Sequence, residues 1–288
     1  MDFLIILING LGLGGIYAMI ALGYTMVYGI AKMLNFAHGD IIMVGGYTIL
    51  VFLSLSPALA IVFSVIFCAA VGIATEKLAY NPLRGASPLA VLITAIGVSY
   101  LLQSLAQIIF GASPRYVIIS SLGSLSIGGI SISYSTLITL ISSALIMALL
   151  SAFVKYTKTG RAMLAVSEDR DAARLMGVNI NRIIMITFAL GSALAAIAGL
   201  FSLLRVPTIM PTYGALPGIK AFCAAVIGGI GSIPGAVLGG ILLGVIECIC
   251  NSVSSLAPFT MAVEFSLLII ILLVKPSGLL GKKRREKV

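Results

Sequence analysis

The stretch LLIIILLV at residues 267–274 decides the fold class, because it is a continuous apolar run without a polar interruption. A strand of a membrane β-barrel alternates apolar residues that face lipid with polar residues that face the lumen. Only helices and closed barrels satisfy every backbone polar group inside the hydrocarbon core. The run therefore indicates an all-α protein that is embedded in a membrane.

The rest of the chain has a similar composition. Of the 288 residues, 60% are hydrophobic and 9% are charged, whereas soluble domains carry about 25% charged residues. A helix that crosses the hydrocarbon core needs about 20 apolar residues. Uncharged runs of at least that length cover 3–31, 41–75, 85–114, 116–154, 183–204 and 221–246. We expect a polytopic transmembrane helical bundle of eight or nine spans that forms a single domain over residues 1–288.

Lys and Arg indicate which loops face the cytoplasm, since short cytoplasmic loops hold the excess of both. They gather near 77–88, in the loop 155–182 and in the tail 275–288. Much of the net charge of +9 lies in that tail, next to an apolar helix, so we interpret the tail as a cytoplasmic anchor and expect no nucleic-acid partner. The Ser- and Gly-rich stretch 111–134 and the segment 206–218 are then external.

The N-terminal quarter allows two arrangements. Residues 3–31 suffice for one tilted helix, 32–40 is a polar interruption, and 41–55 corresponds to only about 22 Å of helix. Two crossings place the N-terminus outside, whereas one crossing and a re-entrant piece place it inside. The chain starts without a basic leader and cleavage site, so we expect the first helix to be retained.

Gly-rich interruptions occur in both halves of the chain. The first is KMLNFAHGD at 32–40, and the second lies within IGGIGSIPGAVLGGILLG at 227–244. Transporters place interrupted helices along a midplane pathway, because freed backbone groups are tolerated only where they line a cavity or are buried in protein. We predict a translocation pathway here, with two ordinary loops as the alternative. The candidate residues are Asn35, His38, Gly39, Asp40, Gly228, Gly229, Gly231 and Gly235.

Two carboxylates, Glu247 and Glu264, lie inside apolar segments. On the predicted topology each is about six residues from the outer end of its helix, so the two share one layer. Carboxylates at this depth either act as proton relays in ion-coupled transporters or hydrogen-bond to neighbouring helices. Both roles remain open from the sequence.

The loop 155–182 contains a predicted helix over 168–176. Ser167 is a good N-cap residue, Asp169 falls in the first turn, where the helix dipole favours anions, and Gly177 suits the position after the C-cap. Its apolar residues are Ala172, Ala173, Leu175 and Met176. The membrane does not cover them, which favours docking to a partner protein over packing against the ends of the chain's own helices.

Motifs of catalysis and metal binding do not occur in the sequence. There is no Walker A pattern, HExxH, GxSxG or CxxC, so we expect no enzyme, and any ATP hydrolysis that drives transport belongs to another chain. A lone His does not make a zinc site, and Cys in apolar segments is most often a small buried hydrophobe. We expect no metal, no disulfide and no bound cofactor.

Three motifs resemble the LivH-type permease subunits of bacterial branched-chain amino acid ABC importers. They are GLGGIYAMIALGYTMVYGIAKMLNFAHGDIIMVGGY (12–47), SEDRDAARLMGVNINR (167–182) and AVIGGIGSIPGAVLGGILLGVIE (225–247). The resemblance implies that 168–176 is the coupling helix that inserts into a cleft of the ATPase subunit. The matching positions are Glu168, Asp169, Ala172, Ala173 and Gly177. It also implies that the breaks at 35–40 and 228–235 surround the translocation pathway.

The same resemblance implies a set of partners in the bacterial inner membrane. They are a LivM-like permease, LivG- and LivF-like ATPases that hold ATP and Mg, and an extracytoplasmic amino-acid-binding protein. Arg115, Arg205 and Lys220 are candidates for contact with that binding protein, with lipid headgroup anchoring as the alternative. Urea or a short amide is an alternative substrate, and an ion-coupled secondary transporter that uses Glu247, Glu264 or Asp40 is the rival class.

Overall fold

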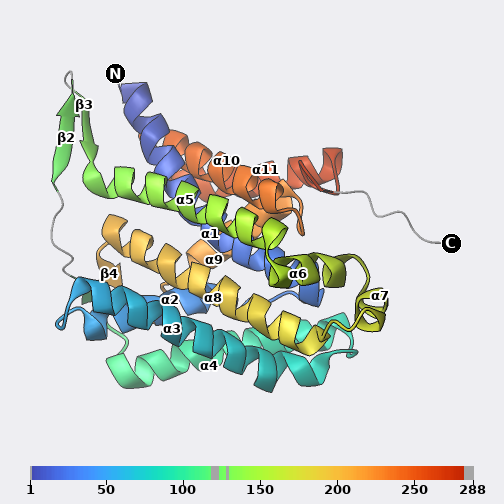
Figure 1. Ribbon diagram of the computed structural model, residues 1–288. Helices are drawn as coiled ribbons and strands as arrows, with labels where there is room; N and C mark the ends of the chain where they lie inside the picture. The colour runs from blue at the N-terminus through green and yellow to red at the C-terminus, as the bar shows by residue number, and fades with distance from the viewer. Residues whose placement is uncertain (1, 118–122, 128–129, 282–288) are drawn as a thin grey trace.

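The computed structural model describes residues 2–117, 123–127 and 130–281, and most of them are helical (Figure 1). Seven described helices are long and apolar enough to cross a membrane, if η1 (Glu76–Tyr80) and η2 (Asn81–Leu83) are counted with α3 and η3 (Ala257–Phe259) with α11. They are α1 (Asp2–Ala31), α3 (Pro57–Thr75), α4 (Pro88–Phe110), α5 (Tyr134–Tyr156), α8 (Ile180–Arg205), α10 (Ile233–Ser252) and α11 (Thr260–Val274). The predicted polytopic helical bundle is therefore confirmed.

Helix α1 packs antiparallel against α10 through glycines on both helices. A Cβ atom added to Gly14 would lie 2.6 Å from the Cα of Ile241, and one added to Gly240 would meet the backbone of Ala18. Small residues let membrane helices approach until their backbones touch. Helix α8 packs against another side of α1, and these three helices form the centre of the bundle.

Two shorter apolar helices, α2 (His38–Phe52) and α9 (Ala215–Gly228), begin at a common point inside the bundle. A Cβ added to Gly39 would lie 2.7 Å from the carbonyl oxygen of Gly214, so the two N-terminal turns touch backbone to backbone. From there α2 runs toward the end of the bundle that carries the β-strands, and α9 runs toward the end that carries α6 and α7 (Figure 1).

The interruptions predicted from the sequence precede α2 and follow α9. α1 ends at Ala31, Lys32 adopts a left-handed conformation with φ of 54°, and residues 33–36 are not regular helix. The second break separates α9 from α10. The apolar segment 219–231 forms the larger part of a 14-residue helix and the turn after it, and this helix is shorter than the roughly 20 residues of a full crossing.

The Ser-rich stretch 111–134, expected to be a loop, contains strands. β2 (Ser124–Ile127) and β3 (Ile130–Ser133) form an antiparallel hairpin, and β1 (Arg115–Tyr116) pairs with β4 (Thr208–Ile209). We call this end of the bundle the hairpin end. The β1–β4 pairing ties the chain after α4 to the segment that leads into α9.

At the opposite end, which we call the α7 end, the predicted helix 168–176 is the shorter α7 (Arg170–Leu175), and a separate helix, α6 (Lys158–Glu168), precedes it. The N-cap of α7 is Asp169, whose carboxylate accepts the amides of Asp171 and Ala172 at 3.0 Å. The prediction of Ser167 as the N-cap is wrong, because its hydroxyl donates to the carbonyl of Leu164 at 2.7 Å. An aspartate in an extended conformation satisfies two amides that the start of a helix leaves unpaired.

The C-terminal end of α7 follows the prediction. Gly177 has a φ of 82°, its amide donates to Arg174, and the amide of Val178 donates to Ala173, which is the Schellman arrangement. Leu175 is 89% and Met176 84% exposed. Ala173, predicted to be part of the exposed apolar surface, is instead buried, because it faces the bundle.

The chain after α11 returns to α9. The amides of Leu279 and Leu280 donate to the carbonyls of Ile227 and Gly228 at 2.8 and 2.9 Å. The last carbonyls of a helix have no partner within the helix, so this segment completes the hydrogen bonding of α9. The basic residues of the predicted anchor at 282–288 lie outside the described residues, and the anchor stays a prediction.

Candidate functional site

A cavity of about 240 Å³ lies between α2, α4 and α9, beside the point where the two short helices meet. Much of its wall is apolar, from Phe36 before α2, Leu92 and Ile96 on α4, and Ile219 on α9. Ile96 and Ile219 are 41% and 44% exposed, so they form an open rim. A concave, mostly apolar space with a few polar groups is typical of a small-molecule site.

Asp40 provides the carboxylate of this cavity. It lies in the first turn of α2 and is 2% exposed. Its oxygen accepts a hydrogen bond from Nε2 of Gln103 on α4 at 2.8 Å, and the same amide contacts the hydroxyl of Ser99 at 3.3 Å. Within residues 2–117, 123–127 and 130–281, no Lys or Arg forms an ion pair with Asp40.

The other two polar pathway candidates of the first break are directed elsewhere. Asn35 accepts a hydrogen bond from the hydroxyl of Tyr80 at 2.8 Å. His38 is buried edge-on against Tyr24, with ring centroids 4.7 Å apart, where Gly23 leaves space for it. Asp40 is therefore the member of this predicted cluster that lines the large cavity.

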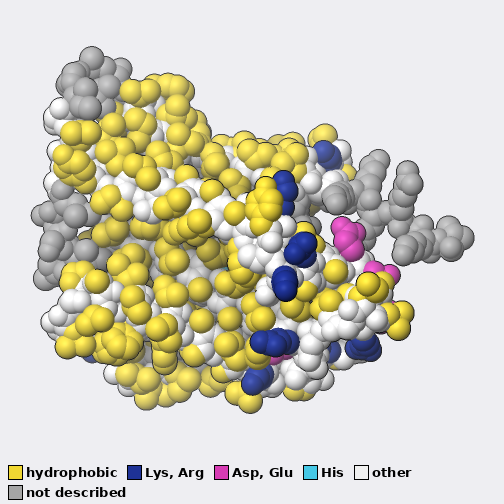
Figure 2. All heavy atoms as spheres, viewed as in Figure 1, with side chains coloured by type: hydrophobic (Ala, Val, Ile, Leu, Met, Phe, Trp, Pro, Cys, Tyr) yellow, Lys and Arg dark blue, Asp and Glu magenta, His cyan; other side chains and the backbone are white. Residues whose placement is uncertain are grey.

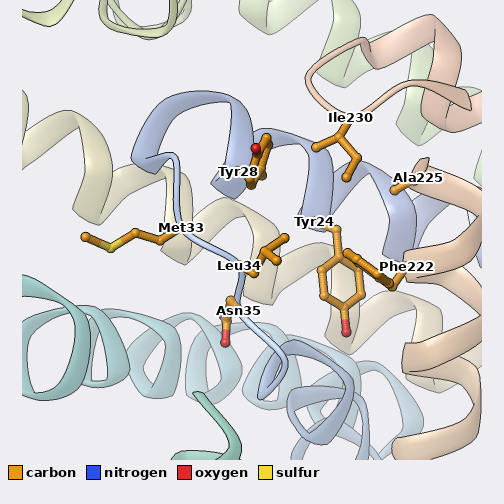
Figure 3. Close-up of a pocket in the computed structure, with 8 residues that line it drawn as sticks. All are labelled: Tyr24, Tyr28, Met33, Leu34, Asn35, Phe222, Ala225 and Ile230. Atoms are coloured by element: carbon orange, nitrogen blue, oxygen red, sulfur yellow. The ribbon is translucent and has the colours of Figure 1, made fainter. Parts of the chain in front are cut away.

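Aromatic side chains close the cavity toward the α7 end. The rings of Tyr24 and Phe222 are 5.7 Å apart, and those of Phe36 and Phe222 are 5.4 Å apart. Tyr24 lines the large cavity and also a second one of about 10 Å³, where Phe222 lies beside Tyr24 and Asn35 lies across from both (Figure 3). We call Tyr24, Phe36 and Phe222 the aromatic gate.

The glycine candidates separate into two places. Gly39 lines the cavity, where it touches the backbone of α9 at Gly214 and Gly218. Sequence reasoning missed these two partners, although a pair of small residues four apart is the signal of close helix contact. The remaining candidates, Gly228, Gly229, Gly231 and Gly235, lie at the turn between α9 and α10 and not at the cavity.

A second group of charged side chains connects α1, α9, α10 and α11. The ammonium of Lys220 is 2.8 Å from Glu247 and 3.2 Å from Glu264, and the hydroxyl of Tyr17 donates to Glu247 at 2.7 Å. We call these four residues the lysine cluster. The two carboxylates share one layer, as the sequence predicted.

The three cations expected at the binding-protein surface do not form one patch. Lys220 is held in the lysine cluster, with 12% of its side chain exposed. Arg115 donates to the carbonyl of Phe110 at 2.9 Å, and Arg205 donates to the carbonyl of Asn9 at 3.4 Å. Contact with a partner stays a prediction for Arg115 and Arg205, which lie at the hairpin end.

Arg170 joins the α7 end to the central helix. Its guanidinium donates to the carbonyl of Ile30, in the last turn of α1, at 2.9 Å. Burial, with the nearby Arg84 guanidinium, lowers the pKa of Arg170 from its usual value, and a cation at a helix C-terminus also interacts favourably with the helix dipole. The predicted contact residues Glu168, Asp169, Ala172 and Gly177 are exposed around this joint.

The bundle of apolar helices, with two short helices that meet beside a cavity, defines a multi-pass helical membrane protein of the permease class. A family model described as "Branched-chain amino acid transport system / permease component" matches residues 6–272. The chain belongs to this family.

Curated relatives agree with this membership over nearly the full length. The branched-chain amino acid permease protein BraD of Pseudomonas aeruginosa is 42% identical over 98% of this chain and 97% of its own. LivH of Escherichia coli is 40% identical over 99% and 98%. A solved structure, PsaBC from Streptococcus pneumoniae in complex with Fab, matches with a TM-score of 0.51 over 93% of this chain and 91% of that one. At 15% identity, that likeness shows the fold alone.

Proposed function

We propose that this chain is the permease subunit of an ATP-driven importer of branched-chain amino acids in the bacterial inner membrane. Membership of the permease family over residues 6–272 carries this proposal, and the names of the relatives supply the substrate class. A second, LivM-like permease and LivG- and LivF-like ATPases complete the transporter, and an extracytoplasmic binding protein delivers the amino acid. The apolar wall of the cavity favours such a side chain over urea or a short amide.

The topology that supports import has nine crossings. Seven are the long helices, and the other two each combine a short helix with a non-helical segment, 32–37 before α2 and 206–214 before α9. The hairpin end and the N-terminus then face outward and the α7 end faces the cytoplasm. Figure 2 supports this orientation, because Lys and Arg gather at the α7 end, whereas the rest of the face in view is largely hydrophobic.

The α7 helix is the proposed point of contact with an ATPase subunit. Its exposed Leu175 and Met176 form an apolar patch bordered by charge, which is typical of a docking surface. Arg170, the first residue of the same helix, holds the end of α1, from which residues 32–37 lead to α2 and the cavity. Movement of α7 with the ATPase is therefore transmitted to the end of α1 through a direct hydrogen bond, and from there through residues 32–37 to the wall of the cavity.

The double variant Leu175→Glu/Met176→Glu tests this function. We expect it to enter the membrane normally, to lose the ATPase subunits on purification, and to lose ATP-dependent leucine uptake in cells that carry the partner subunits. Charge reversal at Asp169 is less informative, because that carboxylate also caps α7. Leu164→Glu, the same exchange on α6 at a half-exposed position, is the matched control and should keep uptake.

Unchanged uptake in the double variant would contradict the proposed coupling. Uptake by this chain alone in liposomes, driven by an ion gradient without ATPase subunits, would contradict the importer and support the ion-coupled class. Uptake of urea or amides in preference to leucine, isoleucine and valine would overturn the substrate.

A further inference from the structure

Among the described residues, the carboxylate of Asp40 has no Lys or Arg partner of the kind that a buried charge needs. A charge at membrane depth is costly unless it is paired or functional, and an isolated buried ion destabilises the fold. Gln103 supplies one neutral donor to Asp40 at 2.8 Å. The position of Asp40 in the first turn of α2, where the helix dipole favours an anion, offsets part of the cost. The remaining charge is directed at the cavity.

The rest of the cavity suits the apolar part of an amine. Branched or aromatic side chains form the wall on three sides, namely Phe36, Ile96 and Ile219. An apolar cavity of about 150 Å³ is large enough for benzene, so the 240 Å³ present here accommodates a branched four-carbon chain together with its polar end. The first turn of α9, at Ala215, borders the same space and presents the positive end of its helix dipole.

We propose that this cavity binds a small apolar molecule through its ammonium group, with Asp40 as the partner of the ammonium and Phe36, Ile96 and Ile219 around the apolar chain. This inference rests on the proposed function, under which the ligand is a branched-chain amino acid in transit. Its carboxylate then faces the N-terminal turn of α9, as anionic groups face the ends of broken helices in other transporters. Gln103 orients the Asp40 carboxylate from α4.

The aromatic gate places this site before a closed passage. Beyond Tyr24 and Phe222 the space narrows to the cavity of about 10 Å³ that Asn35 borders. A bound molecule is therefore held at Asp40 until α9 or residues 32–37 move. Those are the segments that adjoin the α7 end, where Arg170 acts on α1.

The first experiment uses the complete transporter in proteoliposomes with its binding protein. A charge-assisted hydrogen bond is stronger than a neutral one, so we expect Asp40→Asn to lower leucine uptake about tenfold or more. The ATPase activity stimulated by loaded binding protein should persist, because the coupling joint is unchanged. Asp40→Glu should restore part of the uptake, and Ser104→Ala, at an exposed position on α4 next to Gln103, is the control. Unchanged uptake in Asp40→Asn would overturn the inference.

The second experiment measures occupancy directly. Ile96→Cys places a thiol on the rim, and its rate of alkylation by a maleimide is compared with that of the parent complex. Leucine and isoamylamine, which both carry an ammonium and a branched chain, should slow alkylation, whereas 4-methylpentanoate, which lacks the ammonium, should not. Asp40→Asn should abolish the protection. Equal protection by 4-methylpentanoate, or protection that survives Asp40→Asn, would reject the site.

The two experiments separate this inference from the proposed function. If the wild-type complex imports no branched-chain amino acid, the proposed function fails, and protection by isoamylamine still decides whether the cavity binds apolar amines. If import proceeds but isoamylamine and leucine give no protection, the site fails and the function stands.

Discussion

Two acidic sites inside the bundle differ in how their charge is satisfied. In the lysine cluster, Glu247 and Glu264 lie within 3.2 Å of the ammonium of Lys220, and Tyr17 adds a hydrogen bond. At the cavity, Asp40 receives a neutral amide hydrogen bond from Gln103 and borders open space. The first site contains its own cation, although one ammonium serves two carboxylates and Oε2 of Glu264 has no hydrogen-bond partner among the described residues. The second site has no cation from the described residues.

The difference shows how structural and functional charges can be told apart in a membrane protein. A carboxylate that is paired across helices holds those helices together, and removal of its partner leaves an uncompensated buried charge. A carboxylate without a cation adds no such attachment, so its presence points to a ligand that carries the missing charge. The three predictions below test this contrast through the free energy of unfolding.

Lys220→Met should have the largest effect on stability. It leaves two carboxylates together among four helices, and breaking a buried ion pair by removal of one partner costs about 3–5 kcal/mol. We expect a lower thermal unfolding temperature of the complex in detergent and less protein in the membrane. The triple variant Lys220→Met/Glu247→Gln/Glu264→Gln removes all three charges and should recover most of the loss. Full stability in Lys220→Met alone would show that the cluster does not hold the helices.

Neutralising each of the two carboxylates of the lysine cluster should lower the free energy of unfolding by unequal amounts. Glu247 is 2.8 Å from Lys220 and also accepts the hydroxyl of Tyr17, whereas Glu264 is 3.2 Å from the same ammonium. Glu247→Gln should therefore destabilise by about 1–3 kcal/mol, and Glu264→Gln by less, because Lys220 keeps its nearer partner. Thermal unfolding of the two variants side by side measures the order. A larger loss for Glu264→Gln would mean that the cluster is organised around the other carboxylate.

Asp40→Asn should have the smallest effect on stability, although it abolishes most of the uptake. The amide oxygen of Asn still accepts from Gln103, and an unpaired charge is removed, so the change should stay below about 1 kcal/mol. The same unfolding measurement applies, with Lys220→Met as the reference for a large loss. A loss of similar size in Asp40→Asn would place Asp40 with the structural charges.

The helical architecture follows from the sequence because apolar runs and their interruptions report directly on burial in a membrane. The directions of the side chains within the first break, at 32–40, do not follow from the sequence. Asn35, His38 and Asp40 are neighbours in sequence, and the sequence alone grouped them. His38 and Asp40 are two residues apart on a helix, however, which turns their side chains about 200° from each other. His38 therefore packs on Tyr24 while Asp40 faces α4.

The lysine cluster was only half predictable. The shared layer of Glu247 and Glu264 followed from helix length, but Lys220 was assigned to the outer surface. Its partners lie on α10 and α11, and sequence spacing says nothing about which helices become neighbours. A signal was nevertheless present, because a lysine at the edge of a long apolar run needs a carboxylate, and these two lie in the following apolar segments.

Two local features, the β2–β3 hairpin and the N-cap of α7, differ from what the sequence predicts. The alternation of SLSI at 124–127 and ISIS at 130–133 has the period of two that is typical of strands, although the Ser and Gly content of the same stretch favours a loop. Near α7, Ser167 and Asp169 are both good N-cap residues. Which of the two residues caps α7 depends on where α6 ends, and packing of α6 against the bundle sets that end.

The hydrogen bonds from Leu279 and Leu280 to the end of α9 bear on how the protein is made. Ribosomes add about 5–20 residues per second, and roughly 50 residues separate Gly228 from Leu280. The donors of the Ile227 and Gly228 carbonyls are therefore synthesised roughly 3–10 s after the carbonyls themselves. Until the chain has been made as far as Leu280, the last carbonyls of α9 lack these two donors. The assembly of α9 is therefore finished only after α10 and α11 have been made, and a premature stop codon before Leu279 would remove both hydrogen bonds.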